Sequence, residues 1–189
     1  MPAMNSKRHD TPRPALFLDR DGVINVDKGY VDTPDGFEFI HGAIDTIAHF
    51  NAAGWYVFIV TNQTGIAHGH YTEADMFKVH AFMNAELAKH KAHIDRIYYC
   101  PYDLRGSVTR YCVESDDRKP EPGMILKAMR DFPVDAKSSI LIGDKDKDLQ
   151  AGKNANIASY LFNRDNLWDF VKTIDNPHIQ ASFTHANNA

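Results

Sequence analysis

The 189-residue chain has little cysteine, no long apolar run and no excess of basic residues. Its two cysteines, Cys100 and Cys112, are too few for a disulfide framework, so a reducing cytoplasm is the expected compartment. No apolar run is long enough to cross a bilayer, and no membrane partner is expected. The formal net charge of -4 also argues against a nucleic-acid partner.

The composition fits one globular domain between two polar ends. Residues 1–14 lack the apolar core of a secretory signal, so we expect a disordered leader there. Residues 15–176 are expected to form a single domain, because 43% hydrophobic and 24% charged residues are ordinary for a globular protein. Residues 177–189 are expected to be a disordered tail, and the protein is expected to be a monomer.

Apolar strand-like runs alternate with helix-like stretches along the expected domain. The predicted strands are residues 15–19, 55–61, 96–100, 139–143 and 158–162. The predicted helices are residues 41–53, 72–92, 122–130, 145–154 and 166–174. Thr72 and Asp75 form a candidate capping box at the start of the second helix. The alternation predicts an α/β fold with a doubly wound parallel sheet.

Polar residues follow three of the predicted strands. Asp19 and Asp21 follow the first strand, Thr61 and Asn62 the second, and Asp144 the fourth. In such sheets ligands bind beyond the carboxyl ends of the strands, so these side chains are expected to meet there. Three carboxylates close together repel and raise each other's pKa, and a hard cation such as Mg²⁺ removes that problem.

This set of residues suits phosphoryl transfer. Asp19 is predicted to attack phosphorus and form an aspartyl-phosphate, while Asp21 acts as general acid and then activates water. Gly22 lets the backbone turn sharply beside the phosphate. An Asp-x-Asp-Gly run alone is equally a common turn composition. Arg118 and Lys119, just before a predicted helix, favour the phosphate interpretation.

Four motifs in order, across residues 15–162, resemble those of the haloacid dehalogenase (HAD) superfamily of phosphatases. The segments FLDRDGVIN, VTNQTGIA, RKPEPGM and IGDKDKDLQAG are similar to those of the branch of heptose bisphosphate phosphatases and histidinol-phosphatases. The resemblance implies a Mg²⁺-dependent phosphatase of the HAD-like Rossmannoid fold that acts on a sugar phosphate, first of all a heptose 1,7-bisphosphate. Histidinol phosphate or another small polyol phosphate is the alternative substrate.

The resemblance also implies roles for the site residues. Mg²⁺ would be held by the carboxylates of Asp19 and Asp144 and by the backbone carbonyl of Asp21. The residues expected to bind the transferring phosphoryl group are Thr61, Asn62 and Lys119. Lys119 would also neutralise charge that builds up in the transition state. Arg118 would reach the substrate at a second phosphate. Lys145 would support the arrangement of the acidic groups, and Asp148 would stabilise the network that they form.

The chain departs from this branch in its zinc loop, which usually has a Cys-x-His and a Cys-x-Cys before the Arg-Lys-Pro. Only Cys100 remains, and the three changed positions are Tyr102, Ser115 and Asp117. Structural zinc needs four nitrogen or sulfur ligands, so we expect zinc to be absent. The loop would then depend on packing of tyrosines, namely Tyr98, Tyr99, Tyr102 and Tyr111. A metal shared by Cys112, Cys100 and either His93 or Asp103 is the alternative.

A second departure is His68, where the family often has an arginine. Arginine binds phosphate bidentately at any pH and histidine does not, which weakens the case for a bisphosphate substrate. No insertion is long enough for a cap domain, so specificity is expected from residues 27–37, residues 65–71 and the zinc-loop remnant. A binding protein with a vestigial site is the alternative from another class, and the intact catalytic set argues against it.

Overall fold

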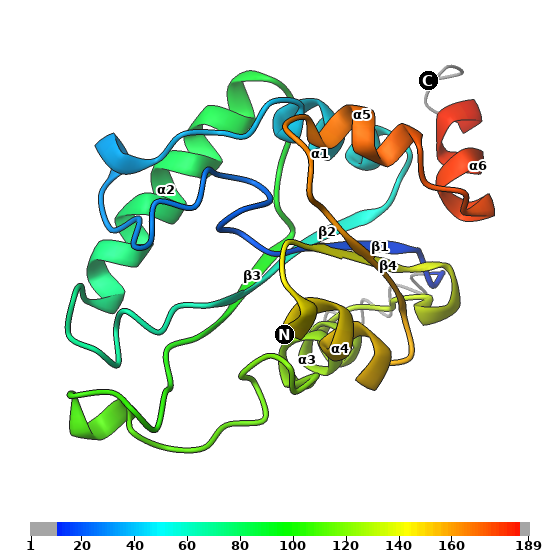
Figure 1. The fold of residues 1–189 in the computed structure, drawn as a ribbon. Helices are drawn as coiled ribbons and strands as arrows, with labels where there is room; N and C mark the ends of the chain where they lie inside the picture. Colours follow the sequence, from blue (N-terminus) through cyan, green and yellow to red (C-terminus); the bar gives the residue numbers. More distant parts are fainter. Residues whose placement is uncertain (1–10, 186–189) are drawn as a thin grey trace, which may run out of the picture.

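The structure is a computed structural model that describes residues 11–185 (Figure 1). Its centre is a sheet of five parallel strands in the order β3-β2-β1-β4-β5. The strands are β1 (Ala15–Leu18), β2 (Tyr56–Asn62), β3 (Arg96–Cys100), β4 (Ile140–Gly143) and β5 (Ala158–Leu161). The helices are α1 (Ala43–Ala52), α2 (Glu73–Lys89), α3 (Gly123–Asp131), α4 (Asp146–Asn154), α5 (Leu167–Lys172) and α6 (Pro177–His185). The predicted doubly wound α/β fold is confirmed.

Both faces of the sheet are covered by helices, which explains why the strands read as continuous apolar runs. Leu16 and Leu18 of β1 point into a core that includes residues of α1, α2 and α5. Ala15 and Phe17 of the same strand point into a second core with residues of α3 and α4. Figure 1 shows α1 and α5 on one side of the sheet and α3 and α4 on the other. All four side chains of β1 are fully buried.

The long helix α2 begins where its capping residues predict. The Thr72 hydroxyl accepts a hydrogen bond from the backbone of Asp75 (3.2 Å), and the Asp75 carboxylate accepts one from the backbone of Thr72 (3.1 Å). The helix ends at Lys89, three residues before the predicted end. Lys91 has a φ of 57°, and a residue in this left-handed region cannot continue a right-handed helix.

The expected disordered tail is wrong over Pro177–His185, which forms α6. Ile179 is fully buried in the core, and Ser182 Oγ lies 2.9 Å from His49 Nε2 of α1. The Asn176 side chain accepts hydrogen bonds from the backbone of His178 and of Ile179 (2.9 and 3.3 Å), which caps the helix. Pro177 is the first residue of the helix, a position at which proline is favourable. Residues 186–189 lie outside the described residues.

The expected disordered leader is also wrong at its end. Residues 1–10 lie outside the described residues, but Arg13 pairs through its backbone with Pro133 and Asp135 (3.0 and 2.8 Å). Its guanidinium lies 3.8 Å from the centre of the Tyr56 ring. The folded domain therefore includes residues before Ala15. No helix between residues 11 and 185 is both long and apolar enough to cross a membrane.

Three loops surround the carboxyl edge of the sheet, and no separate cap domain covers it within the described chain. The first loop follows β1, the second follows β2, and the third connects β3 to α3. The ring of Tyr30 in the first loop packs against that of His70 in the second, with ring centres 4.3 Å apart and the planes tilted by 32°. The Ala67 carbonyl of the second loop accepts hydrogen bonds from the backbone of Ser107 and of Val108 in the third (2.8 and 2.9 Å). The loops therefore form one connected wall.

The burial of α6 gives a direct test of the corrected C-terminal boundary. Ile179→Ala should lower the free energy of unfolding by about 2–4 kcal/mol, because it leaves a cavity in the core. Ala181→Ser, at an exposed position on the same helix, should change it by less than about 0.5 kcal/mol. Urea denaturation measures both, and equal stability of the Ile179→Ala variant and the parent protein would show that α6 is not docked.

Candidate active site

The first strand delivers a buried carboxylate to the carboxyl edge of the sheet. Asp19 directly follows β1, is only 4% exposed, and its backbone N–H donates to the Ile142 carbonyl of β4 (3.0 Å). Asp19 Oδ1 accepts a hydrogen bond from the backbone of Arg20 (2.7 Å). Gly22, with φ of +89°, then turns the chain, and a Cβ there would collide with the Asp144 carboxylate. The turn needs glycine both for its dihedral and for this close approach.

A fully buried ammonium group links Asp19 to the helix after β4. Lys119 Nζ lies 3.0 Å from Asp19 Oδ1 and 2.6 Å from Asp148 Oδ1. Burial lowers the pKa of Lys119, but the charges of Asp19 and Asp148 and their hydrogen bonds raise it above its ordinary value. Lys119 therefore stays protonated in the folded protein.

The side chain of Asn62 holds Lys119 by its backbone. Asn62 Nδ2 donates to the Lys119 carbonyl (3.0 Å), and the Lys119 N–H donates to Asn62 Oδ1 (3.1 Å). Both polar atoms of the amide are thus directed at the backbone of Lys119. Asn62 therefore lies beside Lys119, where its amide binds the Lys119 backbone. The predicted contact of Asn62 with the phosphoryl group stays a prediction.

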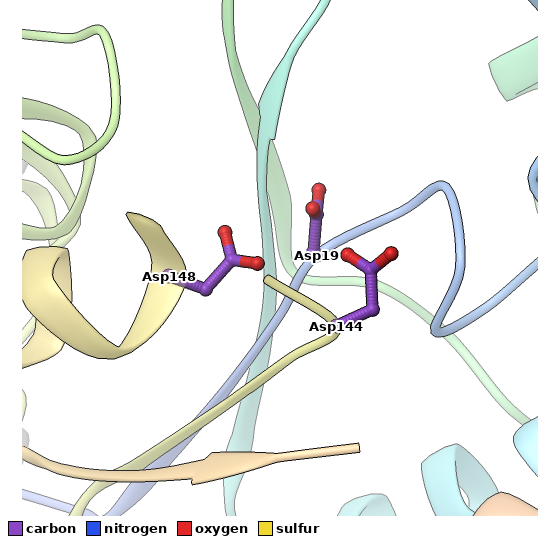
Figure 2. A group of neighbouring side chains, drawn as sticks. All are labelled: Asp19, Asp144 and Asp148. Carbon is purple, nitrogen blue, oxygen red and sulfur yellow. The ribbon is translucent and has the colours of Figure 1, made fainter. Parts of the chain in front are cut away.

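Three carboxylates meet beside this ammonium. Figure 2 shows the side chains of Asp19, Asp144 and Asp148 converging from the end of β1, the turn after β4 and α4. One oxygen from each lies within 4.8 Å of the others, and no other group of three acidic, histidine or cysteine side chains in residues 11–185 is so arranged. Asp148 is already paired with Lys119. Asp19 and Asp144 are therefore the carboxylates best placed to hold a cation.

Asp144 provides the test of whether a divalent cation fits this group. Its Oδ1 is buried and has no hydrogen-bond partner in the described part of the chain. Burial, and then the charge of Asp19, raise the pKa of Asp144 above its ordinary value, while Lys145 opposes this. A bound cation would give that oxygen a partner and offset the repulsion, and hard carboxylate oxygens are the ligands that Mg²⁺ prefers. The residues present fit Mg²⁺.

The carboxylate of Asp21 is held apart from this cluster by neighbouring side chains. Arg20 Nη2 donates to both of its oxygens (2.9 and 3.0 Å), and Asn25 Nδ2 donates to Oδ1 (3.0 Å). Gln63 Nε2 donates to Oδ2 (2.9 Å). Arg20, Asn25 and Gln63 were not predicted as site residues, although all three lie within the segments FLDRDGVIN and VTNQTGIA. The predicted acid/base role of Asp21 stays a prediction.

Gln63 also connects Asp21 to the second strand. Its Nε2 lies 2.9 Å from the hydroxyl of Thr61, which is buried at the end of β2. The Tyr71 hydroxyl donates to Gln63 Oε1 (2.6 Å), which fixes which end of the amide faces Asp21 and Thr61. The structure therefore brings Thr61 to the carboxyl edge with Asp19, as predicted.

The two other predicted cationic residues, Lys145 and Arg118, are held by acidic side chains of the loops. Lys145 Nζ donates to Asp27 Oδ2 in the first loop (2.9 Å) and lies 3.4 Å from Asp144 Oδ2. Arg118 donates through Nη1 to the Tyr102 carbonyl (2.9 Å) and through Nη2 to Asp103 Oδ2 (3.0 Å). Lys145 lies between β4 and α4, Arg118 lies in the third loop, and neither is paired with Asp19.

Comparison with known proteins agrees with this geometry. A family model described as HAD-hydrolase-like matches residues 117–166. The D-glycero-beta-D-manno-heptose-1,7-bisphosphate 7-phosphatase of Rhodopseudomonas palustris is 43% identical over 162 residues, which cover 86% of this chain and 90% of that protein. The alpha-anomer 7-phosphatase of Campylobacter jejuni is 48% identical over 147 residues, 78% of this chain and 80% of that protein. The chain belongs to the HAD family of phosphatases.

A solved HAD phosphatase resembles the whole fold. The D,D-heptose 1,7-bisphosphate phosphatase from B. bronchiseptica, complexed with magnesium and phosphate, superimposes with a TM-score of 0.73 at 29% identity. The match covers 93% of this chain and 99% of that one. The similarity extends over nearly the whole of both chains, and the expected HAD phosphatase activity agrees with the family.

The zinc-loop remnant of this HAD phosphatase is held by other contacts. Cys100 is buried, and burial raises the pKa of its thiol, which is hydrogen-bonded to the Ser115 side chain. Asp117 pairs with Lys127 of α3. Cys112 Sγ lies 3.2 and 3.3 Å from two backbone carbonyls of its own loop. Within residues 11–185, neither cysteine is part of a group of metal-binding side chains.

Two tyrosines fasten this loop and β3 to helix α2. The hydroxyls of Tyr99 and Tyr111 each donate to one oxygen of the Glu73 carboxylate, at 2.8 Å. Tyr111 is buried in a small apolar cluster that Tyr99 and Tyr102 also contact. The expected packing by tyrosines is thus observed at these three residues, with hydrogen bonds to Glu73 that the sequence analysis did not predict.

Arg20, which holds Asp21, is itself fully buried against a histidine. Its Nη1 lies 3.2 Å from His80 Nε2 of α2. Burial, and then the charge of Arg20, lower the pKa of His80 to about 3. His80 is therefore neutral and accepts the hydrogen bond from Arg20, because its place on the long helix turns its side chain inward.

His80 predicts how the stability of the enzyme depends on pH. The folded pKa lies below the unfolded value of about 6.5, so the unfolded chain binds an extra proton as the pH falls below 6.5. Between pH 7.5 and 5, the free energy of unfolding of the parent protein should fall by about 2 kcal/mol more than that of His80→Gln. Glutamine accepts the hydrogen bond from Arg20 but does not titrate.

Urea denaturation at several pH values measures this difference. His90→Gln, at an exposed position of the same helix region, is the matched control and should keep the slope of the parent protein. Identical slopes for His80→Gln and the parent protein would contradict a neutral buried His80.

Proposed function

We propose that the chain is a Mg²⁺-dependent phosphatase that removes the 7-phosphate of D-glycero-D-manno-heptose 1,7-bisphosphate. The observation that carries this proposal is the buried Lys119 ammonium on Asp19, beside an Asp144 oxygen that lacks a partner in the described chain. The names of the curated relatives support the substrate. The altered residue His68 favours a second candidate, histidinol phosphate or another small polyol phosphate.

Asp19 is the proposed nucleophile. Lys119 and the backbone of Arg20 both hold Oδ1, and no residue between 11 and 185 donates a hydrogen bond to Oδ2. We assign Oδ2 to the attack on phosphorus, in which the bond to the sugar oxygen breaks and Asp21 gives that oxygen a proton. Water then attacks the aspartyl-phosphate, the Asp21 carboxylate takes its proton, and Asp19 and phosphate are released.

Thr61 and Lys119 would hold oxygens of the phosphoryl group during both steps. The Thr61 hydroxyl has its partner Gln63 on one side, and Lys119 has an ammonium proton to spare beyond its two carboxylates. Asn62 contributes by fixing the backbone of Lys119. The positive charge of Lys119 opposes the charge that develops on the phosphoryl oxygens.

The carboxylates of Asp19 and Asp144 and the backbone carbonyl of Asp21 are the proposed ligands of Mg²⁺. When bound, Mg²⁺ supplies positive charge that offsets the repulsion between a phosphate and the Asp19 carboxylate. The relative from B. bronchiseptica is a complex with magnesium and phosphate. Arg118 and Lys145 are the proposed contacts of the rest of the substrate. We further propose a cytoplasmic monomer with no nucleic-acid or membrane partner.

Phosphate release from a substrate panel tests the proposed reaction. The panel holds both anomers of the heptose 1,7-bisphosphate, histidinol phosphate and several sugar monophosphates, each with Mg²⁺ or with EDTA. One heptose bisphosphate should be the best substrate, and EDTA or Asp19→Asn should lower kcat by about a thousandfold or more, since the nucleophile or its cation is lost.

Asp45→Asn makes the same chemical change at an exposed position of α1 and should retain activity. Turnover by Asp19→Asn at the parent rate would rule out the aspartyl-phosphate route. A clear preference for histidinol phosphate would move the assignment to the second candidate.

The contacts of the third loop predict that it folds without zinc. Metal analysis after mild purification should find well under one zinc per chain, because Cys100 is a buried thiol whose pKa burial raises and the other three ligand positions are Tyr102, Ser115 and Asp117. A triple variant with Tyr102→His, Ser115→Cys and Asp117→Cys restores the family pattern of ligands and should bind about one zinc. Near one zinc per chain in the parent protein would show that the loop retains a metal.

A further inference from the structure

The carboxylate of Asp103 is a buried negative charge that the mechanism above does not use. It lies in the third loop, is 4% exposed, and is contacted by side chains from two loops. Its Oδ2 lies 3.0 Å from Arg118 Nη2, 3.3 Å from Arg105 Nη2 and 3.3 Å from His68 Nε2. Its Oδ1 accepts hydrogen bonds from the backbone and Nε of Arg105 (3.1 and 3.3 Å).

These partners keep the carboxylate ionised. Burial alone would raise the pKa of Asp103, but the hydrogen bonds from Arg105 and His68 and the charge of Arg118 lower it well below its ordinary value. An ionised buried carboxylate is stable only when it is paired in this way. Asp103 is therefore a fixed negative charge, and the guanidinium groups of Arg105 and Arg118 are arranged around it.

The backbone around Asp103 is fixed as well. The Asp103 N–H donates to the Tyr111 carbonyl (3.1 Å), and the Asp103 carbonyl accepts from Gly106 (2.9 Å). The Ser107 hydroxyl donates to the His68 carbonyl (3.0 Å), so the second and third loops are joined on both sides of the His68–Asp103 contact. The position of the carboxylate is thus set by two loops together.

Arg118 is the partner that links Asp103 to the active site. It precedes Lys119, whose ammonium contacts Asp19, and its guanidinium is held by Asp103 and by the Tyr102 carbonyl. A guanidinium has five N–H donors, and these two contacts use two of them. The remaining donors of this partly exposed side chain are available to a phosphate, for which arginine is well suited.

We propose that Asp103 is a positioning residue that orients Arg118 toward the second phosphate of the substrate, with His68 supporting Asp103 from the second loop. The proposal rests on the proposed function and names the part of the site that recognises a bisphosphate. A flexible arginine loses side-chain entropy when it binds, whereas an arginine held in advance does not. His68 then contributes through Asp103 and not through direct contact with phosphate.

Kinetics with two substrates that differ by one phosphate test this role. The heptose 1,7-bisphosphate carries the second phosphate, and the heptose 7-phosphate lacks it. Asp103→Asn should raise KM for the bisphosphate about tenfold and change kcat less than about twofold, with the monophosphate unaffected. Glu114→Gln makes the same chemical change at an exposed position of this loop and should leave both substrates unchanged.

A double-mutant cycle shows whether Asp103 acts through Arg118. Arg118→Ala should lower the preference for the bisphosphate about tenfold or more, and adding Asp103→Asn should lower it no further. Additive losses, or equal losses on both substrates, would overturn the proposal. If Asp103→Asn does not fold, His68→Gln provides the same test with an expected two- to threefold rise in KM for the bisphosphate, and an unchanged KM would overturn it.

A measurement without substrate separates this proposal from the proposed function. NMR on the whole protein follows the exchange of the Arg118 guanidinium hydrogens with solvent, and the signals are assigned by their loss in Arg118→Ala. This exchange should be at least about tenfold faster in Asp103→Asn than in the parent protein or Glu114→Gln. Unchanged exchange in Asp103→Asn would overturn the positioning role. A parent protein that does not hydrolyse the bisphosphate would instead refute the proposed function, and the exchange result would still decide whether Asp103 holds Arg118.

Discussion

One buried ammonium group, that of Lys119, holds the carboxyl edge of the sheet together. It contacts Asp19 at 3.0 Å and Asp148 at 2.6 Å, and so joins the end of β1 to helix α4. Without it, two buried carboxylates would lose their counter-charge, a change that costs several kcal/mol in a protein interior. Asn62 fixes the backbone of Lys119, so β2 is tied to the same point. The candidate site is built around this contact.

In the surrounding loops, too, acidic side chains are paired with cationic ones. Arg20 holds Asp21, and Arg118 binds Asp103. Asp144 is the exception, since Lys145 lies 3.4 Å from one of its oxygens and the other has no partner in the described chain. Because Asp144 has less positive charge around it than these neighbours have, it is the place where binding of an added cation is most favourable.

Local pattern was enough to predict the fold and the residues at the strand ends. The strands were found because a sheet covered on both faces needs apolar runs, and Asp19 and Asp144 because they end such runs. Gln63 was not assigned, and Asp103 was named only as an alternative metal ligand, since their roles come from partners far along the chain. Gln63 lies 42 positions from Asp21, and Arg118 lies 15 from Asp103. Helix α6 was missed because its contact with the core is short, and Ile179 with the polar Ser182 gives no clear apolar periodicity.

The most direct test of this electrostatic account is the effect of Mg²⁺ on the free energy of unfolding. A cation that binds only the folded protein stabilises it by about 2.7 kcal/mol at a hundredfold excess over its Kd. The account predicts such a rise in the parent protein and in Asp146→Asn, whose side chain lies at an exposed position beside the site. It predicts none in Asp144→Asn. An equal rise in Asp144→Asn, or no rise in the parent protein, would contradict it.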